Sequence, residues 1–355
     1  MVTAVEGSRV TIDALEQFCL RILTSTGVCE KDAQTTTAAL VMTDSWGVFT
    51  HGTKLLRGYV RRLRGGGLRA DVAPEIATEG PAWAVVDGQS ALGQVTTTFA
   101  TEVAMKKAEQ FGVGFVTVRN SCHFGAAGYY AWLAARAGMI GMAMANDVPS
   151  VAAPGSRGPV LGSNPIAFAF PGGEADPFLL DMSIATVAGG KVYARCKRGE
   201  PIPAGWLVDD QGHPTHDGSL YPDRASLAPA AGHKGYGIGL FIEILSGVLS
   251  GAAVTKQVGS WLFSDMSLPT NHGAAILVIN AGAMMDSAIF DRRMADLVGE
   301  IHAAPTAEGA PPLMIPGEIE WRNRRRACAE GIALPEDVLN HLKDTAAECG
   351  QPFLL

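Results

Sequence analysis

Between residues 82 and 145, short apolar runs alternate with stretches of helical periodicity, and this alternation constrains the fold more than any other feature of the chain. Strand-like runs and helical stretches that follow one another pack as layers. The sequence therefore predicts a mixed α/β architecture. The predicted strands are Ala82–Asp87, Gly114–Val118 and Ile140–Ala145, with helices at Phe99–Gln110 and Tyr129–Ala137 between them.

Both ends of the chain have helical periodicity instead. Residues 12–45 predict two helices, and residues 53–64 predict a third that stops at three consecutive glycines. Near the other end, residues 289–302 and 335–348 predict two more helices. Further strands are expected at residues 179–182 and 274–280.

Two other stretches are distinctive in composition. The most membrane-like stretch, from Gly235 to Thr255, contains Glu243 and several glycines, so we expect a buried helix rather than a membrane span, with the helix at Lys234 to Gly247. Residues 197–231 are rich in Pro, Gly and Asp and are predicted to form a loop. This loop contains His213 and His216, but no cysteine or carboxylate cluster completes a zinc-like set, so we expect no metal site.

Composition excludes several classes of protein. With 355 residues, 47% hydrophobic and 18% charged, the chain is predicted to be globular. Its formal net charge of −7 argues against nucleic acid or an anionic membrane as the main partner. The N-terminal residues contain no basic segment followed by an apolar one, so we expect no signal peptide and a cytoplasmic location.

Three histidines have a context that favours function. His51 and His233 lie directly beside a glycine and His123 lies two positions before one, each at the end of a predicted helix or strand. Glycine allows a ligand to approach the backbone closely, and ligand sites gather at the ends of elements. Two further residues are candidates for polar contacts. Lys234 precedes a helix and is suited to a phosphate or carboxylate, and Asp181 follows an apolar run and is suited to a histidine or a ribose hydroxyl.

No GxGxxG run follows a predicted strand. The residues taken alone therefore predict an α/β enzyme with a histidine-rich site, without naming a cofactor.

Several long runs, read in order, resemble the type 2 malate/L-lactate dehydrogenase family, which also contains ureidoglycolate, sulfolactate and diketogulonate enzymes and reductases of cyclic imino acids. The matching runs extend from about residue 10 to residue 340. They are THGTKLLRGYVRRLRGGG, VRNSCHFGAAGYYAWLAARAGMIGMAMAN, PGSRGPVLGSNPIAFAFP, LLDMSIATVAGGKV, RGEPIPAGWLVDDQGHPT, GHKGYGIGLFIEILSGVLSGA and PGEIEWRNRR.

The resemblance implies a fold, an assembly and an activity. It implies a nicotinamide-binding domain with a mixed sheet that is not the Rossmann fold, here residues 79–283, and a helical domain built from both chain ends, here residues 1–78 and 284–355. It also implies a homodimer. The implied reaction is hydride transfer between NAD or NADP and a small 2-hydroxy or 2-oxo acid.

Site residues carry over from the matching motifs. The resemblance implies that His123 or His51 moves the proton, with His123 as the first candidate, and the sequence does not choose between them. Implied cofactor contacts are Asp181, Met182, Ser183, His233, Lys234 and Gly235. Asp147, at a position that is often Ser or Thr in the family, and Asn271 are additional candidates.

One departure concerns the substrate. Many members carry an arginine four residues after the first histidine, where it grips the substrate carboxylate, but this chain has Leu55, although Tyr59 is retained. Leucine cannot bind a carboxylate, so Lys54, Arg57 and Arg157 become candidate anchors. Two alternatives remain open: a reductase of a cyclic imino acid on the same fold, and a catalytically silent binding protein.

Overall fold

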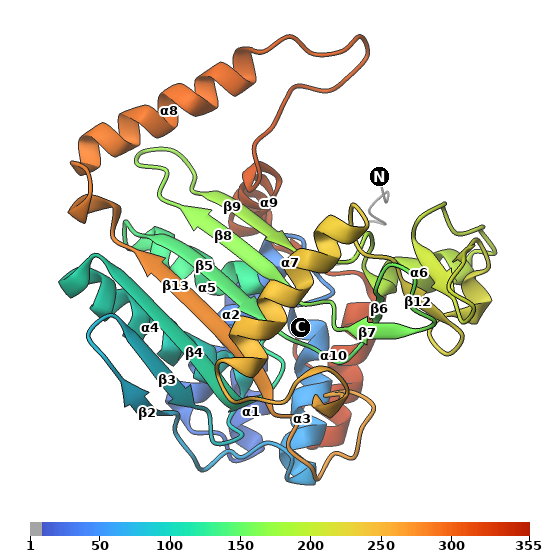
Figure 1. The fold of residues 1–355 in the computed structure, drawn as a ribbon. Coiled ribbons are helices and arrows are strands. Elements are labelled where there is room, and N and C mark those ends of the chain that lie inside the picture. The colour runs from blue at the N-terminus through green and yellow to red at the C-terminus, as the bar shows by residue number, and fades with distance from the viewer. Residues whose placement is uncertain (1–8) are drawn as a thin grey trace.

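A computed structural model describes residues 9–355, so the first eight residues of the segment on which the signal-peptide prediction rests lie outside the described part. Its centre is a seven-stranded sheet (Figure 1). In spatial order the strands are β2 (Glu75–Glu79), β3 (Trp83–Asp87), β4 (Val113–Ser121), β13 (His272–Ile279), β5 (Ile140–Ala145), β8 (Ile166–Phe170) and β9 (Phe178–Met182). Only β3 and β4 pair in parallel, and the other neighbours are antiparallel. The predicted mixed α/β architecture is confirmed.

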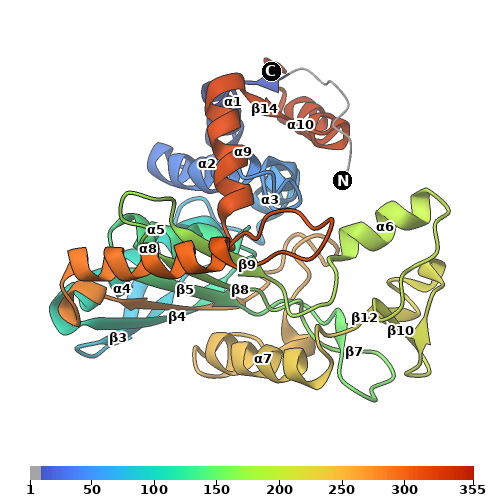
Figure 2. The same ribbon diagram turned by 90° about the horizontal axis from the view of Figure 1, so that it is seen from above.

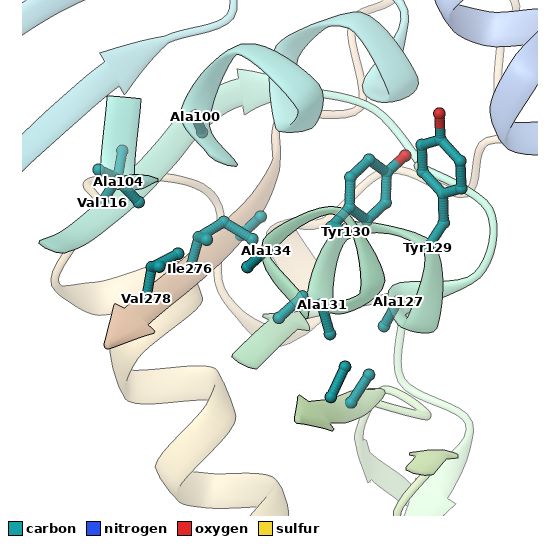
Figure 3. Packing of buried hydrophobic residues seen from close by; sticks show 14 of the residues in the cluster. Ala100, Ala104, Val116, Ala127, Tyr129, Tyr130, Ala131, Ala134, Ile276 and Val278 are labelled. Atoms are coloured by element: carbon teal, nitrogen blue, oxygen red, sulfur yellow. The ribbon is translucent and has the colours of Figure 1, made fainter. Parts of the chain in front are cut away.

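Two helices cover one face of this sheet. The crossover helix α4 (Gly93–Phe111) joins the parallel strands β3 and β4, and α5 (Ala127–Arg136) packs on β5. Small side chains such as Ala104 and Ala134 form much of the contact with β4 and β13 (Figure 3). The helices lie so close that a Cβ at Gly114 would be 2.0 Å from the Ala104 carbonyl oxygen. Alanine and glycine thus set the spacing between this helical layer and the sheet.

The opposite face carries α7 (His233–Glu243) and the π-helical turn η3 (Ile244–Val248), as Figure 2 shows. The predicted helix at residues 234–247 is confirmed, but the prediction that it is buried is wrong. Glu243 is buried, but Phe241 and Ile244 are about half exposed, at 51% and 52%. Apolar composition indicates burial, but among residues 9–355 nothing covers the outer side of this helix. No helix between residues 9 and 355 is long and apolar enough to cross a membrane.

The two chain ends share one core. It combines helices from the first 65 residues with helices from the last 40, and it is closed by a short antiparallel pair between Arg9–Val10 and Ile332–Ala333 (Figure 2). The helices are α1 (Ile12–Ser25), α2 (Glu30–Ser45), the 3-10 turn η1 (Thr53–Leu55), α3 (Leu56–Gly65), α9 (Glu318–Glu330) and α10 (Glu336–Cys349). Five of these follow the predicted helical stretches, and α9 was not predicted.

A smaller five-stranded sheet corrects the predicted loop at residues 197–231. Its strands are β11 (Pro214–Thr215), β10 (Leu207–Asp209), β12 (Ala225–Leu227), β6 (Val151–Ala152) and β7 (Pro159–Leu161), beside α6 (Gly189–Lys197) and the turn η2 (Gly218–Leu220). Leu207 and Leu227 pair across β10 and β12 and are buried. Strands of two or three residues are too short for alternation to be visible in the sequence.

Helix α8 (Ser287–Ala303) confirms the predicted helix at residues 289–302. It lies along the outside of the molecule and joins α9 through a long segment (Figure 1). None of its side chains is buried. Two remaining 3-10 turns, η4 (Thr255–Gln257) and η5 (Ala281–Ala283), flank β13.

Candidate functional site

His123 lies just beyond the end of β4, and its Nδ1 atom is held on two sides. The Tyr59 hydroxyl is 2.9 Å from Nδ1, and the backbone N–H of Gly125 donates to the same atom at 3.3 Å. Nε2 has no hydrogen-bond partner among the described residues. Because both of these contacts engage Nδ1, Nε2 is the ring nitrogen available to a ligand.

Aromatic rings surround the imidazole of His123. Trp261 stacks on it with a centroid distance of 4.4 Å and an interplanar angle of 16°. The ring of His51 lies 5.9 Å away at 24°. The structure therefore brings together the two histidines that the sequence singled out as proton carriers, although they are 72 positions apart. Trp261 was not anticipated.

Burial determines the charge of both histidines. Burial lowers the pKa of His123 to about 3. The negative charge of Asp147 opposes this shift, whereas the nearby His51 and His272 add to it. Burial likewise lowers the pKa of His51, and Asp147 again opposes the shift. Both rings are neutral near pH 7 in this state of the site.

The loop of His51 is anchored by a buried acid. Asp44, at the end of α2, accepts the backbone N–H of Thr53 at 3.0 Å and a short hydrogen bond from the Thr53 hydroxyl. Between them, Gly52 leaves the space that the carboxyl group needs, because a Cβ there would lie 1.8 Å from Asp44 Oδ1. Burial raises the pKa of Asp44 to about 7, although the Thr53 hydrogen bonds lower it. Asp44 was not predicted.

Asp147 follows β5 and pairs with a histidine that the sequence analysis missed. His272 Nε2 lies 3.2 Å from Asp147 Oδ1, and its Nδ1 lies 2.9 Å from the Thr270 hydroxyl. Burial raises the pKa of Asp147, but the His272 hydrogen bond and the nearby histidines lower it more, and the net shift is downward. His272 begins β13 beside Gly273, so a histidine next to glycine at a strand end was again the available signal.

Asn271 plays a connecting part. It has a left-handed backbone with φ of 50°, and its side-chain oxygen accepts the backbone N–H of Asn120 at 2.9 Å. It thus ties the start of β13 to the segment that leads to His123. The side-chain oxygen of Asn271, a candidate cofactor contact, is thus engaged by the Asn120 N–H.

Asp181, in the edge strand β9, meets the first turn of α5. Its Oδ2 accepts the Gly128 N–H at 2.7 Å, a favourable position for a carboxylate at a helix N-terminus. Although the residue as a whole is exposed, burial of the carboxyl group raises the pKa of Asp181 to about 6, against the Gly128 hydrogen bond. Met182 and Ser183, which follow, are half-buried.

The two predicted cofactor-contacting runs lie side by side. Ile184, directly after Ser183, accepts the backbone N–H of Ala230 at 2.8 Å, and Ala230 in turn accepts the N–H of Gly235 at 3.0 Å. His233 and Lys234 lie exposed between these anchors, at the start of α7, which has no side-chain cap. A Cβ at Gly235 would lie 2.1 Å from the Ala230 carbonyl oxygen, so this turn requires glycine.

The candidate substrate residues lie in different places. Tyr59 contacts His123, as described, whereas Leu55 lines a cavity of about 190 Å³ with Leu262 and Met266, and neither His51 nor His123 lines this cavity. The positively charged candidates are held elsewhere. Lys54 pairs with Asp337, Arg57 pairs with Asp344 and Glu348, and Arg157 donates to Asp210 and Gln211 in the smaller sheet region.

No group of three or more metal-binding side chains occurs in residues 9–355. His213 is exposed, and His216 contacts the Ile202 carbonyl. The residues at the site are thus suited to proton transfer at His123 and to contacts with hydroxyl and phosphate groups at Asp181 and the start of α7.

Known proteins match the chain over nearly its full length. The sequence profile of the malate/L-lactate dehydrogenase family matches residues 10–343. Malate dehydrogenase from Pyrococcus abyssi is 36% identical over 349 residues, which cover 96% of this chain and 95% of that protein. Ureidoglycolate dehydrogenase (NAD(+)) from Escherichia coli K12 is 33% identical over 350 residues, covering 97% and 99%.

Solved structures agree with these matches. The structure of malate dehydrogenase from Pyrococcus horikoshii OT3 superimposes with a TM-score of 0.90 at 34% identity, covering 100% of this chain and 99% of that one. Sequence profile, relatives and fold all point to one group, so the chain belongs to the malate/L-lactate dehydrogenase family.

Proposed function

We propose that this oxidoreductase interconverts a small 2-hydroxy acid and its 2-oxo acid with a nicotinamide cofactor, and that His123 moves the proton at Nε2. The observation that carries the proposal is the geometry of the His123 ring. Nδ1 is engaged by Tyr59 and Gly125, while Nε2 has no partner among the described residues. A fixed imidazole with one unengaged nitrogen is suited to general acid–base catalysis.

Proton transfer at His123 depends on the charges around it. During oxidation of a hydroxy acid, the proton of the neutral ring lies on Nδ1, where it donates to the Tyr59 oxygen, so the Nε2 lone pair can take the hydroxyl proton. The Asp147 carboxylate stabilises the imidazolium that results. Burial alone favours the neutral ring. A bound substrate carboxylate adds a second negative charge and raises the pKa of His123 further toward neutrality. His51 lies beside this ring and orients the substrate. When bound, the nicotinamide cofactor accepts or supplies the hydride.

The residues around β9 and α7 fit a dinucleotide. Asp181 offers a carboxylate for ribose hydroxyls, and the uncapped start of α7, with exposed Lys234 and His233, suits a pyrophosphate. The backbone contacts of Ile184 with Ala230 keep these two parts adjacent. We propose Met182, Ser183 and Gly235 as additional contacts. The cofactor is NAD or NADP.

The proposed domains follow the observed cores. One parallel pair in the seven-stranded sheet and the missing GxGxxG run support a cofactor domain, residues 79–283, that is not a Rossmann fold. The core shared by both chain ends supports a helical domain made of residues 1–78 and 284–355. His123 belongs to the first part, and His51 and Tyr59 to the second. The proposed active site therefore lies where the two meet.

Two exposed apolar surfaces support a homodimer. On α7 and the turn after it, Ile238, Phe241, Ile244 and Val248 are exposed, and on α8 Ile289, Leu297 and Ile301 are exposed. A soluble chain rarely leaves large apolar patches uncovered, and two copies of this chain offer each other such surfaces. Light scattering that shows a stable monomer of about 37 kDa would contradict this assembly.

A spectrophotometric screen tests the proposed activity. The purified chain is mixed with reduced NAD or NADP and with pyruvate, oxaloacetate, larger 2-oxo acids or a cyclic imino acid, and the loss of reduced nicotinamide absorbance is followed. We expect turnover with at least one 2-oxo acid. Turnover with the cyclic imine alone would favour the alternative reductase. If neither cofactor binds at millimolar concentration, the proposal is wrong.

A further inference from the structure

The segment from Ser260 to Leu268 covers the ring of His123 but contains no helix or strand of its own. It runs between η4 and β13 as a series of turns beside α3 (Figure 1). Phe263, near its middle, is 88% exposed, whereas Trp261 is only 7% exposed because it stacks on His123. The segment has turn hydrogen bonds of its own, such as the Leu268 N–H to the Asp265 carbonyl at 3.3 Å, and contacts from α3 add to them.

Arg62 on α3 provides these contacts. It is fully buried and has no carboxylate partner among the described residues, and its guanidinium group donates to the backbone of the segment instead. The acceptors are the carbonyl oxygens of Trp261 (3.1 Å), Ser260 (2.9 Å), Asp265 (3.2 Å) and Leu268 (2.6 Å), with Ser264 as a longer contact. The donors of a guanidinium form a rigid fork, so this pattern fixes several peptide groups at once.

The same helix fixes the other side of the catalytic ring. Tyr59 lies three residues before Arg62, which places both side chains on neighbouring positions of α3. The Tyr59 hydroxyl contacts Nδ1 of His123, and the Tyr59 ring stacks on Trp261 at 5.1 Å and 22°. Tyr59, Trp261 and His123 therefore pack as one group. Helix α3 carries Tyr59 itself and holds the backbone of Trp261 through Arg62.

We propose that Arg62 is a positioning residue that keeps Trp261 stacked on His123 and so fixes the direction of Nε2. Arg62 does not touch the substrate, because its side chain is fully buried and its donors are engaged by the segment. This role rests on the proposed function of His123 as the proton carrier. It adds a residue that acts on the reaction through the position of Trp261.

Variants of Trp261 test the stacking directly. Trp261→Leu removes the ring, and we expect kcat to fall by up to roughly 100-fold, since small misplacements of a reacting group have costs of this order. The affinity for reduced nicotinamide, measured by fluorescence titration, should stay unchanged. Trp261→Phe keeps a ring and should restore most of the loss. Equal losses in Trp261→Leu and Trp261→Phe would overturn the stacking role.

A double-mutant cycle tests the route from Arg62. Arg62→Lys keeps the charge but cannot hold four carbonyl groups, so kcat should fall with cofactor affinity unchanged. In a chain that already carries Trp261→Leu, the same change should have little further effect, because residues that act together are not additive. Arg61→Lys is the matched control, since Arg61 is an exposed neighbour paired with Glu348. Multiplicative losses, or an equal loss in Arg61→Lys, would overturn the proposal.

A second readout does not depend on activity. The pKa of His123 is measured by nitrogen-15 NMR in the wild type and in both variants, and the His123 signal is assigned by its loss in His123→Gln. Trp261→Leu and Arg62→Lys should both raise this pKa, because water reaches the ring. An unchanged pKa in both folded variants would contradict the proposal even if activity falls. Conversely, absence of 2-oxo acid turnover in the wild type would refute the proposed function while this titration still tests the positioning.

Discussion

Around His123, polar and aromatic side chains from distant parts of the chain meet and bind one another, whereas along α7 and α8 apolar side chains face solvent. The first region is held by contacts such as Tyr59 to His123 and His272 to Asp147. In the second, Phe241 and Leu297 are about half exposed, at 51% and 52%. The arrangement around His123 is therefore held by contacts within one chain, whereas the apolar surfaces of α7 and α8 are the ones that we propose a second copy covers.

Apart from removal of a histidine itself, a large effect is expected from neutralising Asp147, whose charge acts on both histidines. Asp147→Asn keeps the shape but removes the charge that raises the pKa of His123 and His51. We expect turnover to fall roughly 100- to 1,000-fold, as for loss of one group that stabilises charge in the transition state. The pKa seen in the pH profile should move down. His272→Gln leaves the Asp147 charge in place and serves as the milder control. An unshifted pH profile in Asp147→Asn would show that the carboxylate does not act on the histidines.

A second prediction concerns stability at the His51 loop. The pKa of Asp44 is about 7 in the folded chain and near 3.8 when unfolded, so the folded state binds more protons between these values. The stabilising contribution of Asp44 should thus be full below about pH 3.8 and be lost as pH rises from there to about 7, at roughly 1.4 kcal/mol per pH unit, which is about 3 kcal/mol between pH 5 and pH 7. Denaturant unfolding of wild type and Asp44→Asn from pH 5 to 8 measures this, and a constant difference between them would contradict it.

The substrate preference at Leu55 should change more modestly. Leu55 lies one helical turn before Tyr59, and the adjoining cavity of about 190 Å³ gives a longer side chain room to move. Leu55→Arg should raise kcat/KM for oxaloacetate relative to pyruvate by roughly 10-fold, because a guanidinium binds a second carboxylate. An unchanged ratio in a folded variant would place Leu55 outside the substrate site and in contact only with Leu262 and Met266.

The smallest effect on chemistry should follow from changes on the outer surfaces. Leu297→Asp on α8 and Phe241→Asp on α7 should shift the assembly toward monomers in light scattering, because a buried unpaired carboxylate opposes association. Turnover should change only a few-fold, since the contacts of His123 lie within one chain. Glu300→Gln, an exposed change on the same helix, is the control. A dimer as stable as wild type in both variants would locate the interface elsewhere.

Sequence reasoning succeeded where the signal was local or came from a long matched run. Helices such as α1 and α10 and strands such as β4 and β5 have enough residues for their periodicity to be read. The short strands β10 and β12 do not, and they were predicted as loop. His51 and His123 were singled out by their glycine neighbours and matched runs, and the structure places them together.

The missed residues depend on distant partners. Arg62 looks like one arginine among several on a basic helix, and only its contacts with the segment from Ser260 to Leu268, about 200 positions away, reveal its environment. Trp261 and Asp44 are similar cases. Their importance arises from what packs on them, which periodicity along the chain does not encode. For α7, in contrast, the sequence predicted a feature that the structure does not show. Apolar composition indicated that the helix is buried, but it does not say which part of the molecule would cover it.

The role of His123 as the proton carrier is tested most directly by comparing variants of the two histidines. Single-turnover rates of hydride transfer to the preferred 2-oxo acid are measured in His123→Gln and His51→Gln, with cofactor affinity checked in each. If His123 carries the proton, the rate of hydride transfer should fall roughly 100- to 10,000-fold in His123→Gln, the range for removal of a general acid, and clearly less in His51→Gln. A larger loss of rate in His51→Gln, with near-normal transfer in His123→Gln, would assign the proton transfer to His51 and contradict the role proposed for His123.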